Sequence, residues 1–185
     1  RGITANHHSS VITGLILYFL IIPEWSLFGM GVLAVTVAVA VLSKYLIVFR
    51  GQHILNPAAF AAFVLGLSGY GYATWWVASV WLLVPLLVTG AIVVAKIRKW
   101  TPVLVFIATG FVVYLVEGVM AGDTIPAMWS VFFISYPALF LGFFMLTEPF
   151  TMPPSKRSQV GYGALVGFLS NTTLLNPFIS LTPEL

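Results

Sequence analysis

Residues 50–66 read RGQHILNPAAFAAFVLG, and the arrangement of the whole chain depends on them. Asn56 can cap a helix by accepting hydrogen bonds from first-turn backbone N–H groups, which have no partner within the helix. Pro57 suits the first helical position, where its missing N–H costs nothing. Small residues and phenylalanines from Ala58 to Leu65 then predict a helix too short to span a bilayer, which takes about 20 residues.

A half-helix of this kind is typical of a binding site inside a membrane protein. Backbone groups at its start are tolerated at membrane depth only where protein or a cavity satisfies them. The positive end of the helix dipole also favours an electron-rich ligand. The alternative is a capped helix in a short loop that binds nothing.

The composition predicts an integral membrane protein. Hydrophobic residues make up 60% of the chain and charged residues only 7%, whereas a soluble domain carries about 25% charged residues. Cysteine is absent, which excludes disulfides and thiolate metal sites. The formal charge of +3 gives no reason to expect a nucleic-acid partner. Because the chain starts at Arg1, without an initiator methionine, we expect it to be a fragment.

The apolar segments predict an all-α fold with about six membrane crossings, the half-helix and its loop counting as one. The other crossings are expected at residues 11–22, 27–48, 75–94, 101–119 and 125–146, and a last apolar segment starts at residues 160–169. Pro137 predicts a kink in the segment 125–146. Three basic groups, Lys44 with Arg50, residues 96–99, and Lys156 with Arg157, then fall on one face of the membrane. By the positive-inside rule this face is cytoplasmic.

Proline spacing indicates an inverted repeat. Pro23 and Pro149 are 126 residues apart, and so are Pro57 and Pro183 (149 − 23 and 183 − 57). We therefore predict a polar lead-in at residues 1–10, a first membrane repeat at 11–136 and a partial second repeat at 137–185. Five crossings separate the copies, so the second copy is upside down, and such repeats place a site near the midplane. The chain ends where the second half-helix should begin, so we expect the natural protein to continue past Leu185.

Gln52, His53, Asn56 and Pro57 are the candidate binding residues of the first repeat. Amide and imidazole groups at a helix start suit the edge of a heterocycle that carries donors and acceptors. Haem b would need a second axial histidine from a facing span, and no other ligand is spaced to hold a metal with His53. The alternative for His53 is an interfacial side chain that donates to a backbone carbonyl.

Thr147 and Glu148 are the candidates of the second repeat. An acid near membrane depth is costly and indicates a function, here an ion pathway. The alternative is a solvated interfacial acid paired with Lys156 or Arg157. No phosphate loop, dinucleotide glycine pattern or nucleophile elbow occurs in the sequence, so no catalytic residue is predicted.

These motifs resemble the NqrB/RnfD family, the membrane subunits of the Na+-translocating NADH:quinone reductase and of the Rnf complex. Residues 10–17 (SVITGLIL) and 51–59 (GQHILNPAA) resemble its first half, and residues 141–149 (LGFFMLTEP) and 161–167 (GYGALVG) its second half. The resemblance covers most of the chain, in order. The LTEP, MPPSKR and TPEL sequences look closest to a subgroup in which a short membrane domain is fused to a ferredoxin-reductase-like FAD/NAD(P) domain.

The resemblance implies flavin-based electron transfer, in the family sometimes coupled to Na+, in a bacterial-type cytoplasmic membrane. The riboflavin contacts of the family map to His53 and Asn56, although the family usually has asparagine where His53 stands and aspartate where Glu148 stands. Members with covalent FMN carry a Ser/Thr-Gly-Ala-Thr acceptor after the half-helix, and residues 67–76 contain none. The expected cofactor is therefore a non-covalent riboflavin or FMN.

The expected partners are the lipid membrane and a fused or separate cytoplasmic FAD/NAD(P)H flavoprotein, and the fold allows an oligomer. Two other hypotheses stay open, because a fold does not fix a function. One is a small-molecule channel or transporter with the same inverted repeat. The other is a structural subunit, in which His53→Ala and Asn56→Ala change only stability.

Overall fold

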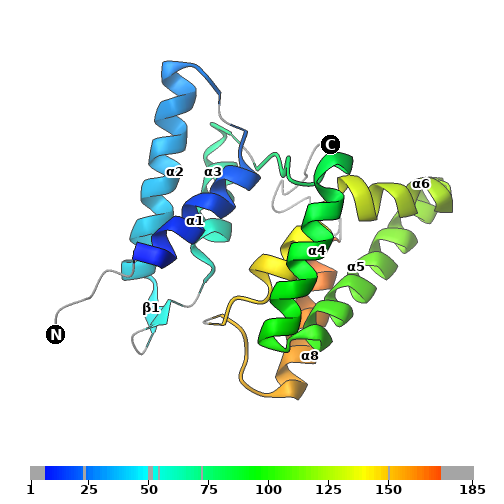
Figure 1. Ribbon diagram of the computed structural model, residues 1–185. Helices are drawn as coiled ribbons and strands as arrows, with labels where there is room; N and C mark the ends of the chain where they lie inside the picture. The colour runs from blue at the N-terminus through cyan, green and yellow to red at the C-terminus, as the bar shows by residue number, and fades with distance from the viewer. Residues whose placement is uncertain are drawn as a thin grey trace. The chain divides into compact units, whose positions relative to one another are not determined.

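A computed structural model describes residues 7–22, 24–49, 52–53, 55–71, 73–149 and 151–171 of the 185-residue chain (Figure 1). The chain forms two compact units, which divide between Trp76 and Val77. The predicted repeat boundary between residues 136 and 137 is a different division of the chain, and it stays a prediction.

The first unit is built from three helices and a short hairpin in its described part. Its elements are α1 (His7–Leu20), α2 (Leu27–Leu46), β1 (Val48–Phe49), β2 (Gln52–His53) and α3 (Pro57–Ser68). Helix α2 begins after Ser26, whose hydroxyl accepts a hydrogen bond from the backbone N–H of Gly29 at 2.9 Å. This cap satisfies one of the N–H groups that a helix start leaves without a partner.

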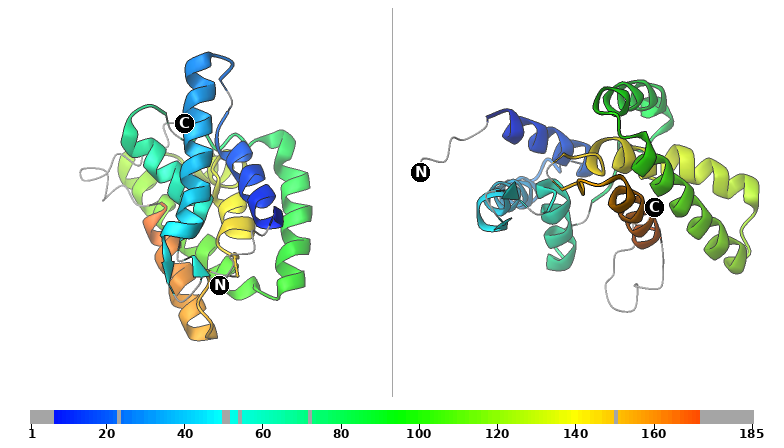
Figure 2. Two further views of the ribbon diagram at one scale, coloured as in Figure 1. Left: turned by 90° about the vertical axis from the view of Figure 1, so that its left-hand side faces the viewer. Right: turned by 90° about the horizontal axis from the view of Figure 1, so that it is seen from below.

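Helix α3 packs against both α1 and α2, and Figure 2 shows α2 and α3 side by side from a second direction. Its inner face is made mostly of small residues: Ala58 and Ala61 are each only 1% exposed, and the larger Leu65 is also buried. Because alanine side chains are short, the backbones of the packed helices can come close together.

The segment after α3 returns to the end of α1. Gly69 ends α3 with a φ of 72°, a left-handed conformation that glycine adopts without strain. The backbone N–H of Trp75 and the hydroxyl of Thr74 both donate to the carbonyl of Leu20, at 2.9 and 3.1 Å. The apolar pattern predicted that the next helix begins at Trp75. Because Thr74 and Trp75 are hydrogen-bonded to the end of α1, that helix begins later, at Val80.

The second unit contains two long helices, a broken helical segment and a final helix. They are α4 (Val80–Ile97), α5 (Trp100–Ala121), the broken segment α6 (Ile125–Ser130), π-helix η1 (Val131–Ser135), α7 (Ala138–Phe140) and π-helix η2 (Leu141–Met145), and α8 (Lys156–Leu169). Phe106 and Phe132 are fully buried at the centre of its core.

Glycines allow α8 to lie directly against α5. A Cβ added to Gly163 would lie 2.5 Å from the carbonyl oxygen of Pro102, and one added to Gly167 would lie 2.6 Å from that of Phe106. Real Cβ atoms do not come this close to a backbone oxygen, so the contact requires glycine on α8.

Three helices in the described part are long and apolar enough to cross a membrane: α2, α4 and α5. The segments Ile125–Ser135 and Ala138–Met145 form a pair bent by 50°, which makes a fourth span if the pair crosses as one. The break contains Pro137, which has no N–H to donate to the preceding turn, and the predicted kink is confirmed. Helices α1 and α3 are shorter than a span, so the total of six crossings stays a prediction.

Candidate functional site

The start of α3 has the cap that the sequence predicts. The Oδ1 atom of Asn56 accepts hydrogen bonds from the backbone N–H groups of Ala58 and Ala59, at 3.0 and 3.1 Å. Pro57 occupies the first turn and is buried. The helix ends at Ser68, three residues later than predicted, and its 12 residues extend about 18 Å at 1.5 Å per residue. It remains too short to cross a bilayer of about 30 Å.

Asn56 itself is half-buried. Because the cap uses Oδ1, the Nδ2 group is the part of this side chain that can donate to a ligand. The buried Pro57 and Ala58 close one side of the helix start to water. The position thus combines a helix dipole, an amide donor group and an apolar wall.

Residues 52 and 53 form a strand, where the sequence predicted a polar loop. Strand β2 pairs with β1 in antiparallel register, with His53 opposite Val48 and Gln52 opposite Phe49. This hairpin precedes the start of α3. Its two strands pair backbone N–H and C=O groups that an irregular loop would leave without a partner. The side chains of Gln52 and His53 lie outside the described part of the structure, so their predicted ligand contacts stay predictions.

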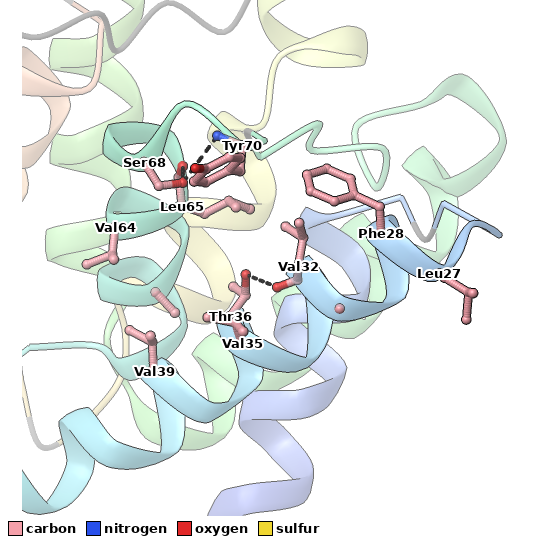
Figure 3. A pocket seen from close by; sticks show the side chains of 12 residues that line it. Leu27, Phe28, Val32, Val35, Thr36, Val39, Val64, Leu65, Ser68 and Tyr70 are labelled. Atoms are coloured by element: carbon pink, nitrogen blue, oxygen red, sulfur yellow. Dashed lines mark hydrogen bonds between the residues drawn. The ribbon is translucent and has the colours of Figure 1, made fainter.

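A groove of about 620 Å³ runs between α2 and α3 (Figure 3). Its walls are almost wholly apolar: α2 contributes Leu27, Phe28, Gly31, Val32, Val35, Thr36 and Val39, and α3 contributes Ala61, Val64, Leu65 and Ser68, with Tyr70 beyond it. The two hydroxyl groups that line the groove donate hydrogen bonds to backbone carbonyls of their own helices. Thr36 donates to the carbonyl of Val32 at 2.8 Å, and Ser68 donates to that of Leu65 at 2.6 Å. The groove therefore offers hydrocarbon contacts along most of its length.

One end of the groove has a polar border. A smaller cavity of about 160 Å³ shares Phe28, Val32, Thr36, Leu65 and Tyr70 with the groove and is also lined by Glu24 and Thr74. One carboxylate oxygen of Glu24 accepts a hydrogen bond from Ser26, which also caps α2. The acid thus lies at the positive end of the α2 dipole, which stabilises it.

The second-repeat candidates, Thr147 and Glu148, lie where η2 ends. Thr147 is buried, and its hydroxyl donates to the carbonyl of Phe143 at 2.7 Å. Glu148 is half-buried, with its Oε2 atom shielded from solvent. Its backbone carbonyl accepts from the N–H groups of Thr151 and Met152, at 3.3 and 3.1 Å. The Glu148 carboxylate is therefore neither fully solvated nor fully buried.

Helix α8 supports the turn that contains Glu148. Gln159 is only 4% exposed, and its Nε2 donates to the carbonyl of Pro153 at 2.8 Å. This hydrogen bond ties the segment that follows Glu148 to the first turn of α8.

The candidate residues thus fall into two sets, one in each unit. The half-helix predicted to begin at Pro183 lies outside the described residues. Within the described part of the chain, no group of three or more His, Cys, Asp or Glu side chains could hold a metal ion.

Sequence reasoning missed the groove between α2 and α3. Its α2 wall follows helical spacing, with Leu27, Gly31, Val35 and Val39 four residues apart. Helix α2 is apolar on all sides, however, so hydrophobic periodicity marks no face. Gly31 and Thr36 are the residues on this wall that could have indicated it.

No protein-family model, curated protein or solved structure matches the chain. Composition and the apolar helices place it among the multi-pass α-helical membrane proteins.

Proposed function

We propose that the chain is a membrane-embedded electron-transfer domain of an oxidoreductase similar to the NqrB/RnfD family, and that it holds a non-covalent riboflavin or FMN. The observation that carries the proposal is the Asn56-capped start of the short helix α3. The sequence resemblance associates the same position with riboflavin. In this role the domain passes electrons between a cytoplasmic NAD(P)H/FAD flavoprotein and an acceptor in the membrane or on its other side.

The donor set at the α3 start fits one edge of a flavin. The Nδ2 group of Asn56 can donate to a ring carbonyl oxygen, and the helix dipole favours the negative charge of a reduced ring. A bound flavin supplies the ability to accept and release electrons. The chain's own residues orient the ring through Asn56 and exclude water through Pro57 and Ala58.

The proposed inverted repeat draws support from two helix starts. Ser26 caps α2 and Ser155 caps α8, each by accepting from the backbone N–H three residues further on, at 2.9 and 3.1 Å. The two serines are 129 residues apart (155 − 26), close to the 126-residue offset of the prolines. Glu148 is the candidate of the second repeat, and it would provide the ion pathway if electron transfer is coupled to ion movement.

The test uses the detergent-purified full chain. Riboflavin is added, excess is removed by desalting, and the absorbance of the protein fraction is recorded. We expect a flavin band with wild type and its loss with Asn56→Asp, because aspartate keeps the capping oxygen but lacks the Nδ2 donor. A wild-type fraction without flavin absorbance would overturn the proposal.

A channel or transporter with the same architecture is the rival function. It predicts flux of a polar solute through protein-containing liposomes in the absence of any redox partner. Under the electron-transfer proposal the liposomes stay impermeable to such a solute, and Asn56→Asp does not change this.

A further inference from the structure

The groove between α2 and α3 extends from one end of a membrane span to beyond its middle. Helix α2 has 20 residues, which extend about 30 Å and match the hydrocarbon thickness of a bilayer. Leu27 is its first residue, and Val39 lies 12 positions further, about 18 Å along the axis. One leaflet of the hydrocarbon layer is about 15 Å deep. The groove is therefore long enough to hold a single acyl chain of one leaflet.

The walls of the groove are suited to hydrocarbon. Val32, Val35 and Val64 supply apolar surface, and the hydroxyls of Thr36 and Ser68 are used by their own helices (Figure 3). A ligand in this part of the groove gains contact surface but finds few groups to hydrogen-bond. A polar ring would lose its hydrogen bonds to water there without replacement.

The end of the groove near Leu27 has a different chemistry. Phe28 and Tyr70 stand at this end in an edge-to-face pair, with ring centroids 6.2 Å apart. Tyrosine and phenylalanine at the end of a span are suited to the interface between hydrocarbon and headgroups. The adjoining cavity is bordered by Glu24, the only acid among residues 1–76 of the sequence. A negative carboxylate beside aromatic faces complements a cationic group.

We propose that this groove is a lipid site that holds one acyl chain of a phospholipid with an ethanolamine headgroup, with the lipid ammonium at Glu24. The apolar walls of the groove hold the acyl chain. The negative charge of Glu24 selects an amine-bearing headgroup over an anionic one. The proposal is independent of flavin binding at the α3 start.

Gly31 offers a way to block the groove without disturbing the fold. It lies in the groove wall, and a Cβ added there meets nothing within 4 Å. We therefore expect leucine at this position to be accommodated by the protein and to occupy the space of the acyl chain. Gly66 of α3 also has nothing within 4 Å of an added Cβ, and it does not line the groove. Gly66→Leu is thus the matched control.

Native mass spectrometry of the delipidated full chain in detergent tests the proposal. The protein is mixed with equal amounts of phosphatidylethanolamine and phosphatidylglycerol that carry identical acyl chains. We expect one retained phosphatidylethanolamine per chain, loss of this adduct in Gly31→Leu and its retention in Gly66→Leu. In Glu24→Gln we expect the preference for ethanolamine over glycerol to fall by about 1.5-fold to fivefold, the range of an exposed ion pair.

Several outcomes would overturn the proposal. Equal lipid retention by Gly31→Leu and wild type places the lipid elsewhere, and an unchanged headgroup preference in Glu24→Gln removes the role of the acid. A protein dimer that Gly31→Leu dissociates would show that a second copy fills the groove. Circular dichroism of each variant shows whether it is folded, and if Gly31→Leu does not fold, Gly31→Val applies the same block with a smaller side chain.

Discussion

The amide oxygen of Asn56 accepts a hydrogen bond from the backbone N–H of Ala58 over 3.0 Å, and this contact fixes where α3 begins. Removing it exposes two first-turn N–H groups, since Ala59 uses the same oxygen. We therefore expect Asn56→Ala to destabilise the protein by about 1 kcal/mol. Asn56→Asp keeps the oxygen and adds a negative charge at the positive end of the dipole, so its stability should equal that of wild type or exceed it. Thermal unfolding followed by circular dichroism in detergent compares the variants, and equal midpoints for Asn56→Ala and wild type would contradict the role of the cap.

The close packing of α8 against α5 allows a second prediction about stability. Gly163→Ala places a methyl group 2.5 Å from the carbonyl oxygen of Pro102, and a backbone atom cannot move aside as a flexible side chain can. We expect a loss of about 1–3 kcal/mol, the usual cost of overpacking. Gly161→Ala is the control on the same helix, because an added Cβ there meets nothing within 4 Å. Alanine favours a helix over glycine by about 1 kcal/mol, so Gly161→Ala should be neutral or stabilising. If both variants unfold at the same temperature, the helices do not pack as closely as described.

Gln159 holds the turn that contains Glu148. Gln159→Leu removes the donor to the carbonyl of Pro153 and leaves that oxygen without its partner. The expected cost is about 1–3 kcal/mol in unfolding free energy. Lys156→Gln changes an exposed residue of the same helix and should stay within about 0.5 kcal/mol of wild type. A Gln159→Leu variant as stable as Lys156→Gln would show that the hydrogen bond contributes nothing.

The absence of cysteine makes the membrane topology directly measurable. Single cysteines are introduced as Lys99→Cys, Asp123→Cys and Lys156→Cys, at three exposed or half-exposed positions between helices or at a helix start. Because α5 separates the first two and the bent pair separates the last two, we expect Lys99→Cys and Lys156→Cys to react on the cytoplasmic side and Asp123→Cys on the other. Labelling with a membrane-impermeant maleimide, in intact and in permeabilised cells, shows on which side each cysteine lies. Reaction of Asp123→Cys and Lys156→Cys on the same side would show that the bent pair does not cross the membrane.

The sequence predicted the elements whose signals are local. A cap such as Asn56 with Pro57 and a helix breaker such as Pro137 act through neighbouring residues, and both lie where expected. The bounds of α2 and α5 also agree with the apolar segments to within two residues. Local signals of this kind do not depend on the rest of the fold.

Features that depend on distant contacts, or that involve segments too short to show a pattern, were missed. The late start of α4 follows from the hydrogen bonds of Thr74 and Trp75 to Leu20, more than 50 residues away. The pairing of Val48 with His53 joins two segments that are too short for strand periodicity to reveal. In α2 the uniformly apolar sequence conceals which side faces α3. The candidate ligand residues could be named from their chemistry, but the sequence could not show that the Asn56 amide oxygen accepts from both Ala58 and Ala59.

The ratio of flavin to protein tests the central proposal most directly. The full chain is purified in detergent, saturated with riboflavin and desalted, and the flavin released by denaturation is measured against protein concentration. We predict a ratio near one for wild type, and a ratio near zero for Asn56→Asp at unchanged thermal stability. A wild-type ratio near zero, or an Asn56→Asp ratio equal to that of wild type, would contradict a flavin site at the start of α3.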